Sequence, residues 1–273
     1  MSLVSINKIS ILGFGRMGKA MVSGWLENDL PNTSINIIDP NIDNNDKFIQ
    51  KSKLQIIKID EADLSDGIII LAVKPQVINS VLEQLKNKIT SKTIIVSIVA
   101  GYSISDIRKY VGNNPKVIRT MPNTPAAIGK GMTVLFTEDK LSKDLESIVE
   151  KLFDSIGQYS WIMDESLMHI VTAISGSGPA YYYYFTECLS KIAQENGLEK
   201  EFADILVKQT LFGSSSLMDF SHGESLSKLR QNVTSPGGTT EAALKILIED
   251  DKLHSLLSSA INNALIKSKS LSK

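Results

Sequence analysis

The segment Ser235-Pro236-Gly237-Gly238-Thr239-Thr240 is the part of this sequence best suited to hold a small anion. Its two adjacent glycines leave backbone N–H groups open to close approach. Thr239 and Thr240 stand where the next helix should begin, and a helix N-terminus adds free donors and positive potential. We therefore predict a pocket for a carboxylate with hydroxyl groups beside it.

The sequence Gly13-Phe14-Gly15-Arg16-Met17-Gly18 follows a predicted strand, Ile9–Leu12, and opens the first predicted helix. In this pattern Gly13 permits a tight turn, Gly15 lets the backbone approach a pyrophosphate, and Gly18 lets the helix pack closely on the strand. We predict that these six residues bind a dinucleotide. The alternative is a glycine-rich turn without a ligand.

Asp39 ends the second predicted strand, 21 positions after Gly18. An acid at this place commonly binds the adenosine ribose hydroxyls of NAD and repels the extra phosphate of NADP. The alternative is an Asp-Pro turn in which Asp39 binds its own backbone. No arginine follows in the next loop, so this feature taken alone favours NAD.

Three further loops should reach the same edge of the sheet, because ligands of open parallel sheets bind at the carboxyl ends of the strands. They are Ala72-Val73-Lys74-Pro75, Val99-Ala100-Gly101 and Met121-Pro122-Asn123-Thr124-Pro125. Lys74 is either a cofactor contact or a surface lysine. The small turn at Ala100 suits close packing of a nicotinamide ring. The last loop, stiffened by two prolines, either positions that ring or is purely structural.

The first 160 residues alternate strand and helix patterns, and the strands are apolar on both faces. This is typical of a parallel sheet covered on both sides, the doubly wound α/β class. The predicted strands are Ile9–Leu12, Ile35–Ile38, Ile68–Val73, Thr93–Val99, Lys116–Met121, Met132–Phe136 and Gly157–Met163. The predicted helices between them are Met17–Leu26, Val77–Leu85, Ile104–Val111 and Leu141–Phe153.

Beyond Met163 every pattern is helical. The segments are Ser166–Ile174, Pro179–Asn196, Lys200–Phe220, Ser225–Gln231, Thr240–Asp250 and Lys252–Leu271. We therefore predict a Rossmann-type dinucleotide-binding domain over residues 1–162 and an all-α domain over residues 163–273. The segment with Ile205, Leu211 and Phe212 is apolar on more than one stripe, which fits either a buried central helix or a dimer interface.

The composition is that of an ordinary globular protein, with 42% hydrophobic and 22% charged residues and a net charge of −1. This balance gives no electrostatic reason to expect nucleic acid or an anionic membrane as a partner. The single cysteine, Cys188, excludes an internal disulfide and a Cys-based zinc site, and the three histidines lack metal spacing. We see no signal peptide and no apolar run of about 20 residues, so we expect a cytoplasmic protein without a metal.

With these residues in place, the sequence resembles the pyrroline-5-carboxylate reductases over nearly its whole length. The resemblance is carried by the fingerprint Gly13 to Gly18, by Ala72 to Pro75, by Met121 to Pro125, and most specifically by Ser175-Gly176-Ser177-Gly178-Pro179-Ala180-Tyr181 and Ser235 to Thr240. It implies a nucleotide-binding domain followed by a helical dimerisation domain. Members of the family are dimers, and some assemble further into decamers.

The resemblance implies that a nicotinamide hydride, from NADPH or NADH, reduces 1-pyrroline-5-carboxylate to L-proline. It assigns the substrate carboxylate to the loop of Ser235, Gly237, Gly238 and Thr239, and a hydrogen bond to the ring nitrogen to Thr240. It further implies that Glu224 lies near the substrate, and that the cofactor contacts Gly13 to Gly18, Ala72, Val73, Lys74, Pro75, Ala100 and Asn123. Many members carry a small polar or basic residue near position 39 and prefer NADPH, so Asp39 is a departure and both cofactors stay open.

Two other functions compete with this interpretation. A 3-hydroxyacid dehydrogenase needs a catalytic lysine shortly after the Gly-x-Gly that starts a long helix, to accept the hydroxyl proton. Here Tyr182 and its neighbours occupy that place, and no lysine occurs before Lys191. A non-catalytic nucleotide sensor would share the fold but has no need of the carboxylate pocket. Imine reduction needs no strong protein acid, since a protonated imine is already an electrophile.

Overall fold

The computed structural model describes residues 8–42, 46–221 and 223–271. They divide into two compact units. The described residues of Met1–Ser177 and Ala264–Lys273 form the first, here called the sheet unit, and those of Gly178–Asn263 form the second, the helical unit. The predicted domain boundary near residue 162 stays a prediction.

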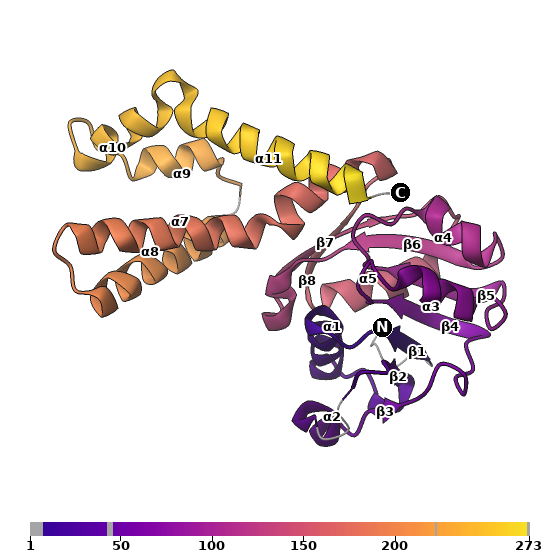
Figure 1. The fold of residues 1–273 in the computed structure, drawn as a ribbon. Helices are drawn as coiled ribbons and strands as arrows, with labels where there is room; N and C mark the ends of the chain where they lie inside the picture. Colours follow the sequence, from indigo (N-terminus) through magenta and orange to yellow (C-terminus); the bar gives the residue numbers. More distant parts are fainter. Residues whose placement is uncertain (1–7, 43–45, 222, 272–273) are drawn as a thin grey trace. The chain divides into compact units, whose positions relative to one another are not determined.

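The sheet unit is built on one eight-stranded sheet with the order β3-β2-β1-β4-β5-β6-β7-β8 (Figure 1). The strands are β1 (Ile9–Leu12), β2 (Ile35–Ile38), β3 (Gln55–Ile56), β4 (Asp66–Leu71), β5 (Lys92–Ser97), β6 (Lys116–Met121), β7 (Gly131–Phe136) and β8 (Gly157–Trp161). Neighbours pair in parallel, apart from β6 and β7, which are antiparallel.

The reversal at β7 follows from the length of its connection. Residues 122–130 hold only a 3₁₀ turn, η3 (Thr124–Ile128), and Gly129 with a φ of +66°. A parallel crossover needs a dozen or more residues. The chain therefore turns back beside β6, and the sheet departs from all-parallel pairing at this one place.

Apolar side chains alternate along the central strands and contribute to two cores, one on each face of the sheet. In β1, Ile9 and Ile11 join the core that contains Trp25, whereas Leu12 joins the other core. The helices of the sheet unit are α1 (Arg16–Glu27), η2 (Asn32–Ser34), α2 (Lys47–Ser52), α3 (Ile78–Leu85), α4 (Ile104–Val111), α5 (Lys143–Asp154), η4 (Glu165–Leu167), α6 (Met168–Val171) and the π turn η5 (Thr172–Gly176). Helices α1 and α5 cover one face, and α3 and α4 the other.

The carboxyl half of β6 is fixed by a buried ion pair. Arg119, 2% exposed, donates to Glu165 Oε1 at 2.8 Å. The same oxygen accepts the backbone N–H of Ile104, the first residue of α4, at 2.9 Å. One carboxylate thus ties a strand, a helix start and the η4 turn together, which holds the loop after β6 in place.

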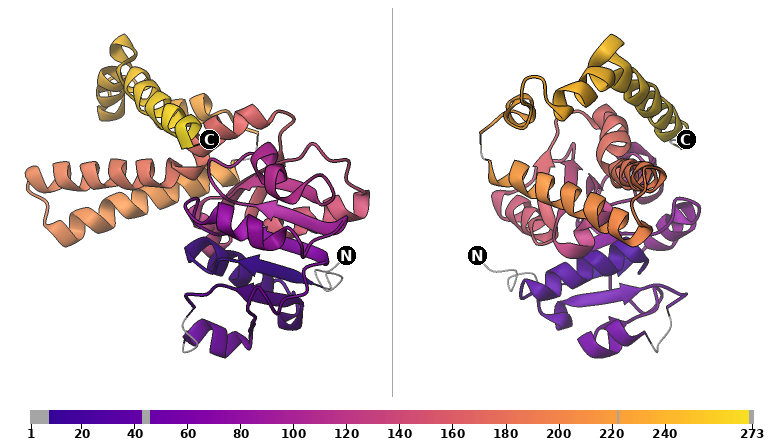
Figure 2. Two further views of the ribbon diagram at one scale, coloured as in Figure 1. Left: turned by 45° about the vertical axis from the view of Figure 1, so that its right-hand side comes forward. Right: turned by 90° about the vertical axis from the view of Figure 1, so that its left-hand side faces the viewer.

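The helical unit contains α7 (Gly178–Glu195), α8 (Lys200–Phe220), α9 (Leu226–Asn232), α10 (Thr239–Ile248), η6 (Glu249–Asp251) and the first part of α11 (Lys252–Leu271). Helices α7 and α8 form a hairpin and lie side by side in both views of Figure 2. Gly197, with a φ of +94°, turns the chain after α7. Between the helices, Ser190 Oγ donates to Asp204 Oδ1 at 2.6 Å.

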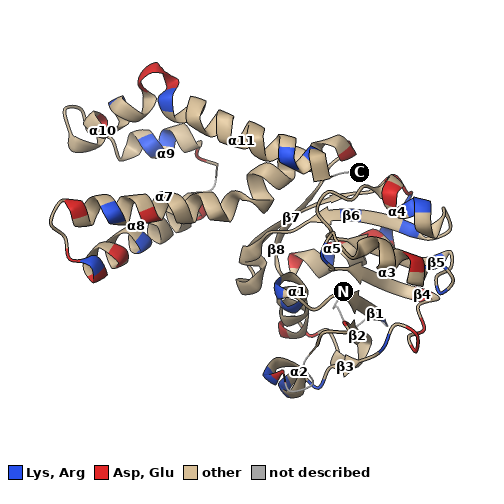
Figure 3. Ribbon diagram, viewed as in Figure 1, with Lys and Arg blue, Asp and Glu red and all other residues tan. Residues whose placement is uncertain are grey.

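The helical unit lacks a core of its own. Of its described residues only Gly178, Ser190 and Ala203 are buried. Large apolar side chains are exposed instead, and Phe212 is 66% and Phe220 81% exposed. No charged residue interrupts positions 178–186 of α7 or 209–218 of α8, and the charges of this hairpin in Figure 3 lie mostly toward its turn. Exposed apolar surface of this extent marks an interface, which decides against a helix buried within one chain.

We expect Phe212→Glu to weaken self-association, because it puts a charge on the uncharged part of α8, where an apolar side chain is exposed. Light scattering after size exclusion should show a lower mass than for the wild type. Lys200→Glu, at the exposed charged end of the same helix, should keep the wild-type mass. An unchanged mass for Phe212→Glu would place the interface elsewhere.

Candidate active site

The strand register brings the residues predicted to bind the nucleotide to one edge of the sheet. Leu12 of β1 pairs with Ile38 of β2 and with Leu71 of β4, and Leu71 pairs with Ser97 of β5. The last residues of these four strands therefore lie side by side in the sheet. The fingerprint, Asp39, Ala72 and the turn at Ala100 therefore follow neighbouring strand ends, at the edge where ligands of open α/β sheets bind.

The three fingerprint glycines have different physical roles. A Cβ on Gly13, whose φ is +96°, would lie 2.6 Å from the carbonyl oxygen of Ala72. A Cβ on Gly18 would lie 2.5 Å from the carbonyl oxygen of Gly13. Gly15 is exposed, and a Cβ there would meet nothing within 4 Å. Two glycines are thus required by packing, and Gly15 presents bare backbone outward.

Asp39 binds the glycine loop as well as its own turn. Its Oδ2 accepts the backbone N–H of Phe14 at 2.8 Å, and its Oδ1 accepts that of Asn41 at 2.9 Å. The contact with Asn41 is the turn-forming alternative considered from the sequence. The contact with Phe14 was not predicted, and it fastens the loop to the end of β2. The carboxylate remains half-buried at this edge.

The loop is braced from outside by α2, a helix that sequence reasoning missed. The buried Phe14 ring lies 6.1 Å from the Phe48 ring, and Lys19 Nζ lies 5.2 Å from the same Phe48 ring. Lys19 also pairs with Asp46 at 3.0 Å, and this hydrogen bond lowers the pKa of Asp46 below its ordinary value. Asp46 caps α2, and an Asp before Lys-Phe-Ile was the available signal.

The remaining fingerprint side chains divide between solvent and core. Arg16, the first residue of α1, is exposed beside Gly15, whereas Met17 packs against the core next to Trp25. Beyond β4, Ala72 donates its N–H to the carbonyl of Leu12 at 2.8 Å.

The turn after β4 points its polar residues outward. Val73 is half-buried, and Lys74 and Pro75 are exposed. The carbonyl of Lys74 accepts the N–H of Val77 at 3.1 Å, which closes the turn before α3. Ala100 is half-buried at the neighbouring strand end.

The side chain of Asn123 makes hydrogen bonds to two other segments of the sheet unit. Its Oδ1 accepts the N–H of Met132 in β7 at 2.9 Å, and its Nδ2 lies 3.3 Å from both the carbonyl oxygen and the Oγ of Ser175. The side chain thus joins the proline-rich loop to a strand and to the π turn η5. Its contact with the cofactor stays a prediction.

The proposed carboxylate loop precedes α10 in the helical unit. Gly237 has a φ of +70°. Its N–H donates to Glu241 Oε2 at 2.7 Å, and the N–H of Gly238 donates to the carbonyl of Ser235 at 3.0 Å. The N–H groups of both glycines are therefore already used within the loop.

The open donors belong to the helix itself. Helix α10 begins at Thr239, and no side chain caps it. Within the described part of the chain, the N–H groups of Thr239 and Thr240 have no partner, as expected for the first positions of a helix. Thr240 is half-buried, whereas Thr239 and Ser235 are exposed.

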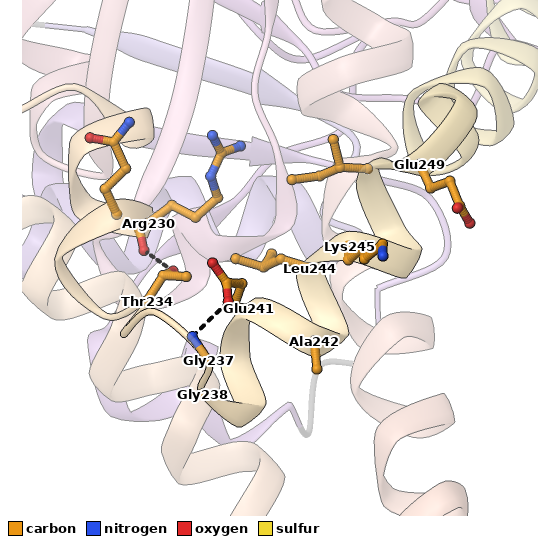
Figure 4. A pocket seen from close by; sticks show the side chains of 11 residues that line it. Arg230, Thr234, Gly237, Gly238, Glu241, Ala242, Leu244, Lys245 and Glu249 are labelled. Carbon is orange, nitrogen blue, oxygen red and sulfur yellow. Dashed lines mark hydrogen bonds between the residues drawn. The ribbon is translucent and has the colours of Figure 1, made fainter.

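Gly237 and Gly238 line an open groove of about 710 Å³, within the size range of small-molecule sites. Figure 4 shows Arg230 of α9 and Glu241 and Lys245 of α10 around it. Glu224 is not among the lining residues, and its Oε2 accepts Asn232 Nδ2 at 3.0 Å. Ser235, Thr239 and Thr240 are not among the lining residues either, so the substrate contacts of all four residues stay predictions.

Neither a metal centre nor a membrane span is present in the described ranges. No three His, Cys, Asp or Glu side chains gather there in a way that could hold a metal ion. None of the helices described is both long and apolar enough to cross a bilayer.

Comparison with known proteins decides the family. Residues 165–271 match the family model for pyrroline-5-carboxylate reductase dimerisation, and residues 8–101 match that for NADP oxidoreductase, coenzyme F420-dependent. A pyrroline-5-carboxylate reductase of Pasteurella multocida is 31% identical over 251 residues, which are 90% of this chain and 91% of that protein. The chain belongs to the pyrroline-5-carboxylate reductase family.

Solved structures agree with this assignment. A pyrroline-5-carboxylate reductase from Coxiella burnetii is 33% identical, with a TM-score of 0.90 over 98% of this chain and 100% of that chain. The Plasmodium falciparum pyrroline carboxylate reductase, solved with NADP bound, is 30% identical, with a TM-score of 0.83 over 98% and 100% of the two chains. The doubly wound fold followed by a helical domain, and the class of NAD(P)H-dependent oxidoreductase, are thereby confirmed.

The two kinds of fingerprint glycine can be separated by mutation. Gly15→Ala should lower the free energy of unfolding by about 1 kcal/mol or less, because the Cβ meets open space. It should raise the Kd for NADPH and NADH, because the Cβ stands where the pyrophosphate must approach. Gly18→Ala should instead destabilise the fold by about 1–3 kcal/mol, since its Cβ meets a backbone oxygen. Thermal unfolding and fluorescence titration measure the two effects, and an unchanged Kd for Gly15→Ala would remove the loop from the cofactor site.

Proposed function

We propose that this protein reduces the C=N bond of 1-pyrroline-5-carboxylate with NADPH or NADH and so forms L-proline. The observation that carries the proposal is the open N-terminus of α10. Two glycines precede it, no side chain caps it, and the N–H groups of Thr239 and Thr240 are unpaired within the described residues. A small carboxylate fits such a terminus.

The sheet edge fits a nicotinamide dinucleotide. Gly15 leaves room where a side chain would stand, and α1 begins there without a side-chain cap, so its first N–H groups suit a pyrophosphate. Asp39 lies at the end of β2, the place of a ribose-binding acid. When bound, the reduced nicotinamide supplies the hydride.

The substrate carboxylate would be held by the start of α10. Thr239 and Thr240 offer backbone N–H groups, and Ser235 offers an exposed hydroxyl. The N–H groups of Gly237 and Gly238 are used inside the turn. These residues would contribute because they have no side chain to block the approach of the carboxylate. Glu224, like Ser235, Thr239 and Thr240, does not line the groove, and its contact with substrate rests on the family resemblance alone.

Thr240 is the residue proposed to act on the ring nitrogen. Its hydroxyl makes no hydrogen bond within the described part of the chain, so it is free to bind a ligand. A hydroxyl near the nitrogen orients the ring and assists proton delivery. Fixing the carboxylate and the nitrogen places the electrophilic carbon, and orientation of this kind can supply a large part of the rate.

The residues at the start of α7 argue against an alcohol dehydrogenase. The first turns of α7 carry Tyr181 to Tyr184, and Lys191 is the first lysine in that helix. No side chain there can accept the proton of a hydroxyl group in the manner of a catalytic lysine. A non-catalytic sensor is distinguished by turnover, because it would bind a nucleotide and oxidise none.

The exposed apolar helices support a homodimer as the working form. Further assembly into a decamer, a cytoplasmic location and the absence of nucleic-acid and membrane partners stay predictions from the sequence. The choice between NADPH and NADH also stays open, because the charge of Asp39 disfavours the 2′-phosphate of NADPH, whereas many members of the family prefer NADPH.

The reaction is tested by the loss of nicotinamide absorbance with purified protein and 1-pyrroline-5-carboxylate, with NADH and NADPH in parallel. Oxidation that depends on the imine, with L-proline as product, supports the proposal. Binding of a cofactor without oxidation of either one would exclude the reductase function.

Thr240→Ala should lower kcat by roughly 10–100-fold, because the hydroxyl beside the ring nitrogen is lost. The KM for the cofactor should stay near the wild-type value, since the proposed partner is the substrate. Thr240→Ser keeps the hydroxyl and should recover most of the rate. A wild-type kcat for Thr240→Ala would reject this role.

Asp39→Asn should shift the ratio of kcat/KM toward NADPH, roughly tenfold, because it removes the charge that opposes the 2′-phosphate. The amide oxygen can still accept the N–H of Phe14. Asp39→Ala loses that bond too and should weaken both cofactors. An unchanged ratio in Asp39→Asn would mean that the charge does not select the cofactor.

A further inference from the structure

Glu241 places a carboxylate of the protein itself on the substrate loop. It is the third residue of α10, and its Oε2 accepts the N–H of Gly237 at 2.7 Å (Figure 4). The side chain therefore reaches back past the helix start to the turn that precedes it. The residue at the helix cap, Gly238, has no side chain that could do this.

The first half of the loop is held by α9 without help from Glu241. The Thr234 hydroxyl donates to the carbonyl of Arg230 at 2.7 Å, and the Thr234 N–H donates to that of Gln231 at 3.0 Å. The N–H of Gly238 then closes a turn onto the carbonyl of Ser235 at 3.0 Å.

Gly237 is the weak point of this arrangement. Its φ of +70° is a conformation that glycine adopts and leaves freely, and a Cβ on it would meet nothing within 4 Å. Gly237 is also exposed, so no neighbouring side chain encloses it on that side. Gly237 lies inside the turn closed by Gly238 and Ser235, and among the described residues Glu241 is the partner of its N–H.

We propose that Glu241 is a positioning residue of the carboxylate site. By binding the N–H of Gly237 it keeps the turn in the shape that leaves the N–H groups of Thr239 and Thr240 open to the substrate. The role rests on the proposed function, because the substrate carboxylate is assigned to this helix start. A charge-assisted hydrogen bond of this kind is stronger than a neutral one, so its loss should be measurable.

If Glu241 opposed substrate binding, its removal would lower the KM for the substrate and not raise it. If the substrate itself needed the N–H of Gly237, Glu241 would be an internal competitor, and its removal would tighten binding. The two roles also differ in their need for charge. A positioning residue needs an acceptor oxygen, which glutamine supplies, whereas repulsion of the substrate carboxylate needs the negative charge of glutamate.

The test compares Glu241→Ala and Glu241→Gln in the imine reduction assay. We expect Glu241→Ala to raise the KM for 1-pyrroline-5-carboxylate roughly tenfold, the loss equivalent to one hydrogen bond to a charged group, with the KM for the cofactor unchanged. Glu241→Gln keeps an acceptor oxygen but loses the charge, so its KM should stay within about threefold of the wild type. The control is Glu249→Gln, which removes a charge from the same groove without touching the loop. A KM for Glu241→Ala at or below the wild-type value would overturn the proposal, as would a Gln variant as impaired as the Ala variant.

Hydrogen exchange separates this proposal from the reaction itself. The N–H of Gly237 should exchange faster in Glu241→Ala than in the wild type and at the wild-type rate in Glu241→Gln. Absence of turnover in the wild type would reject the proposed function but leave this readout intact. Equal exchange in all three proteins would overturn the positioning role whatever the activity.

Discussion

Two helix N-termini that the protein leaves open are the constraint on which the rest of the site depends. Helices α1 and α10 begin after Gly15 and Gly238, and neither has a side-chain cap. By contrast, α2, α4, α5 and α9 begin at Asp46, Ser103, Ser142 and Ser225, whose side chains accept backbone N–H groups. A glycine in place of a capping side chain costs about a few tenths of a kcal/mol, and a ligand anion can supply the acceptor that is absent. Helices α3, α6 and α8 also lack a side-chain cap, so α1 and α10 are distinguished by the glycine at the cap, which leaves no side chain over the first N–H groups. The neighbouring contacts serve to keep each terminus in place.

Those neighbouring contacts follow one pattern in both loops. At α1, Asp39 accepts the N–H of Phe14 and so fixes the loop without filling the space above Gly15. At α10, Glu241 accepts the N–H of Gly237 and leaves the next N–H groups open. In each case a carboxylate of the protein binds a donor beside the proposed anion site, so the loop gains order while its terminus stays accessible. Such a carboxylate also adds negative charge beside the ligand, which at Asp39 bears on the choice of nucleotide.

The sequence predicted the frame of the fold more fully than the contacts within the site. The strands Ile9–Leu12, Ile35–Ile38 and Lys116–Met121 have the predicted bounds, because runs buried on both faces are distinct from what flanks them. The two-residue β3 and the short α2 were missed, since neither is long enough to show a period. The glycines marked both loops because Gly13 and Gly18 leave no room for a Cβ, and because Gly237 has a positive φ. The partners of Phe14, Asn123 and Gly237 depend on side-chain rotamers and on chain segments distant in sequence, which no local pattern records.

Self-association should stabilise the helical unit and thereby the proposed substrate loop that this unit carries. With Gly178, Ser190 and Ala203 as its buried residues in the described chain, it cannot draw enough free energy from its own packing to hold α9 and α10 firmly. The apolar side chains that would supply this energy, such as Phe212 and Phe220, are exposed in one chain. A partner that covers them stabilises the folded helices by mass action, in proportion to the concentration of protomers. The bond between Glu241 and Gly237 orders the turn only where α10 is already a helix. Association of two chains should therefore stabilise the proposed carboxylate site, and on the proposed function one domain would serve both dimerisation and substrate binding.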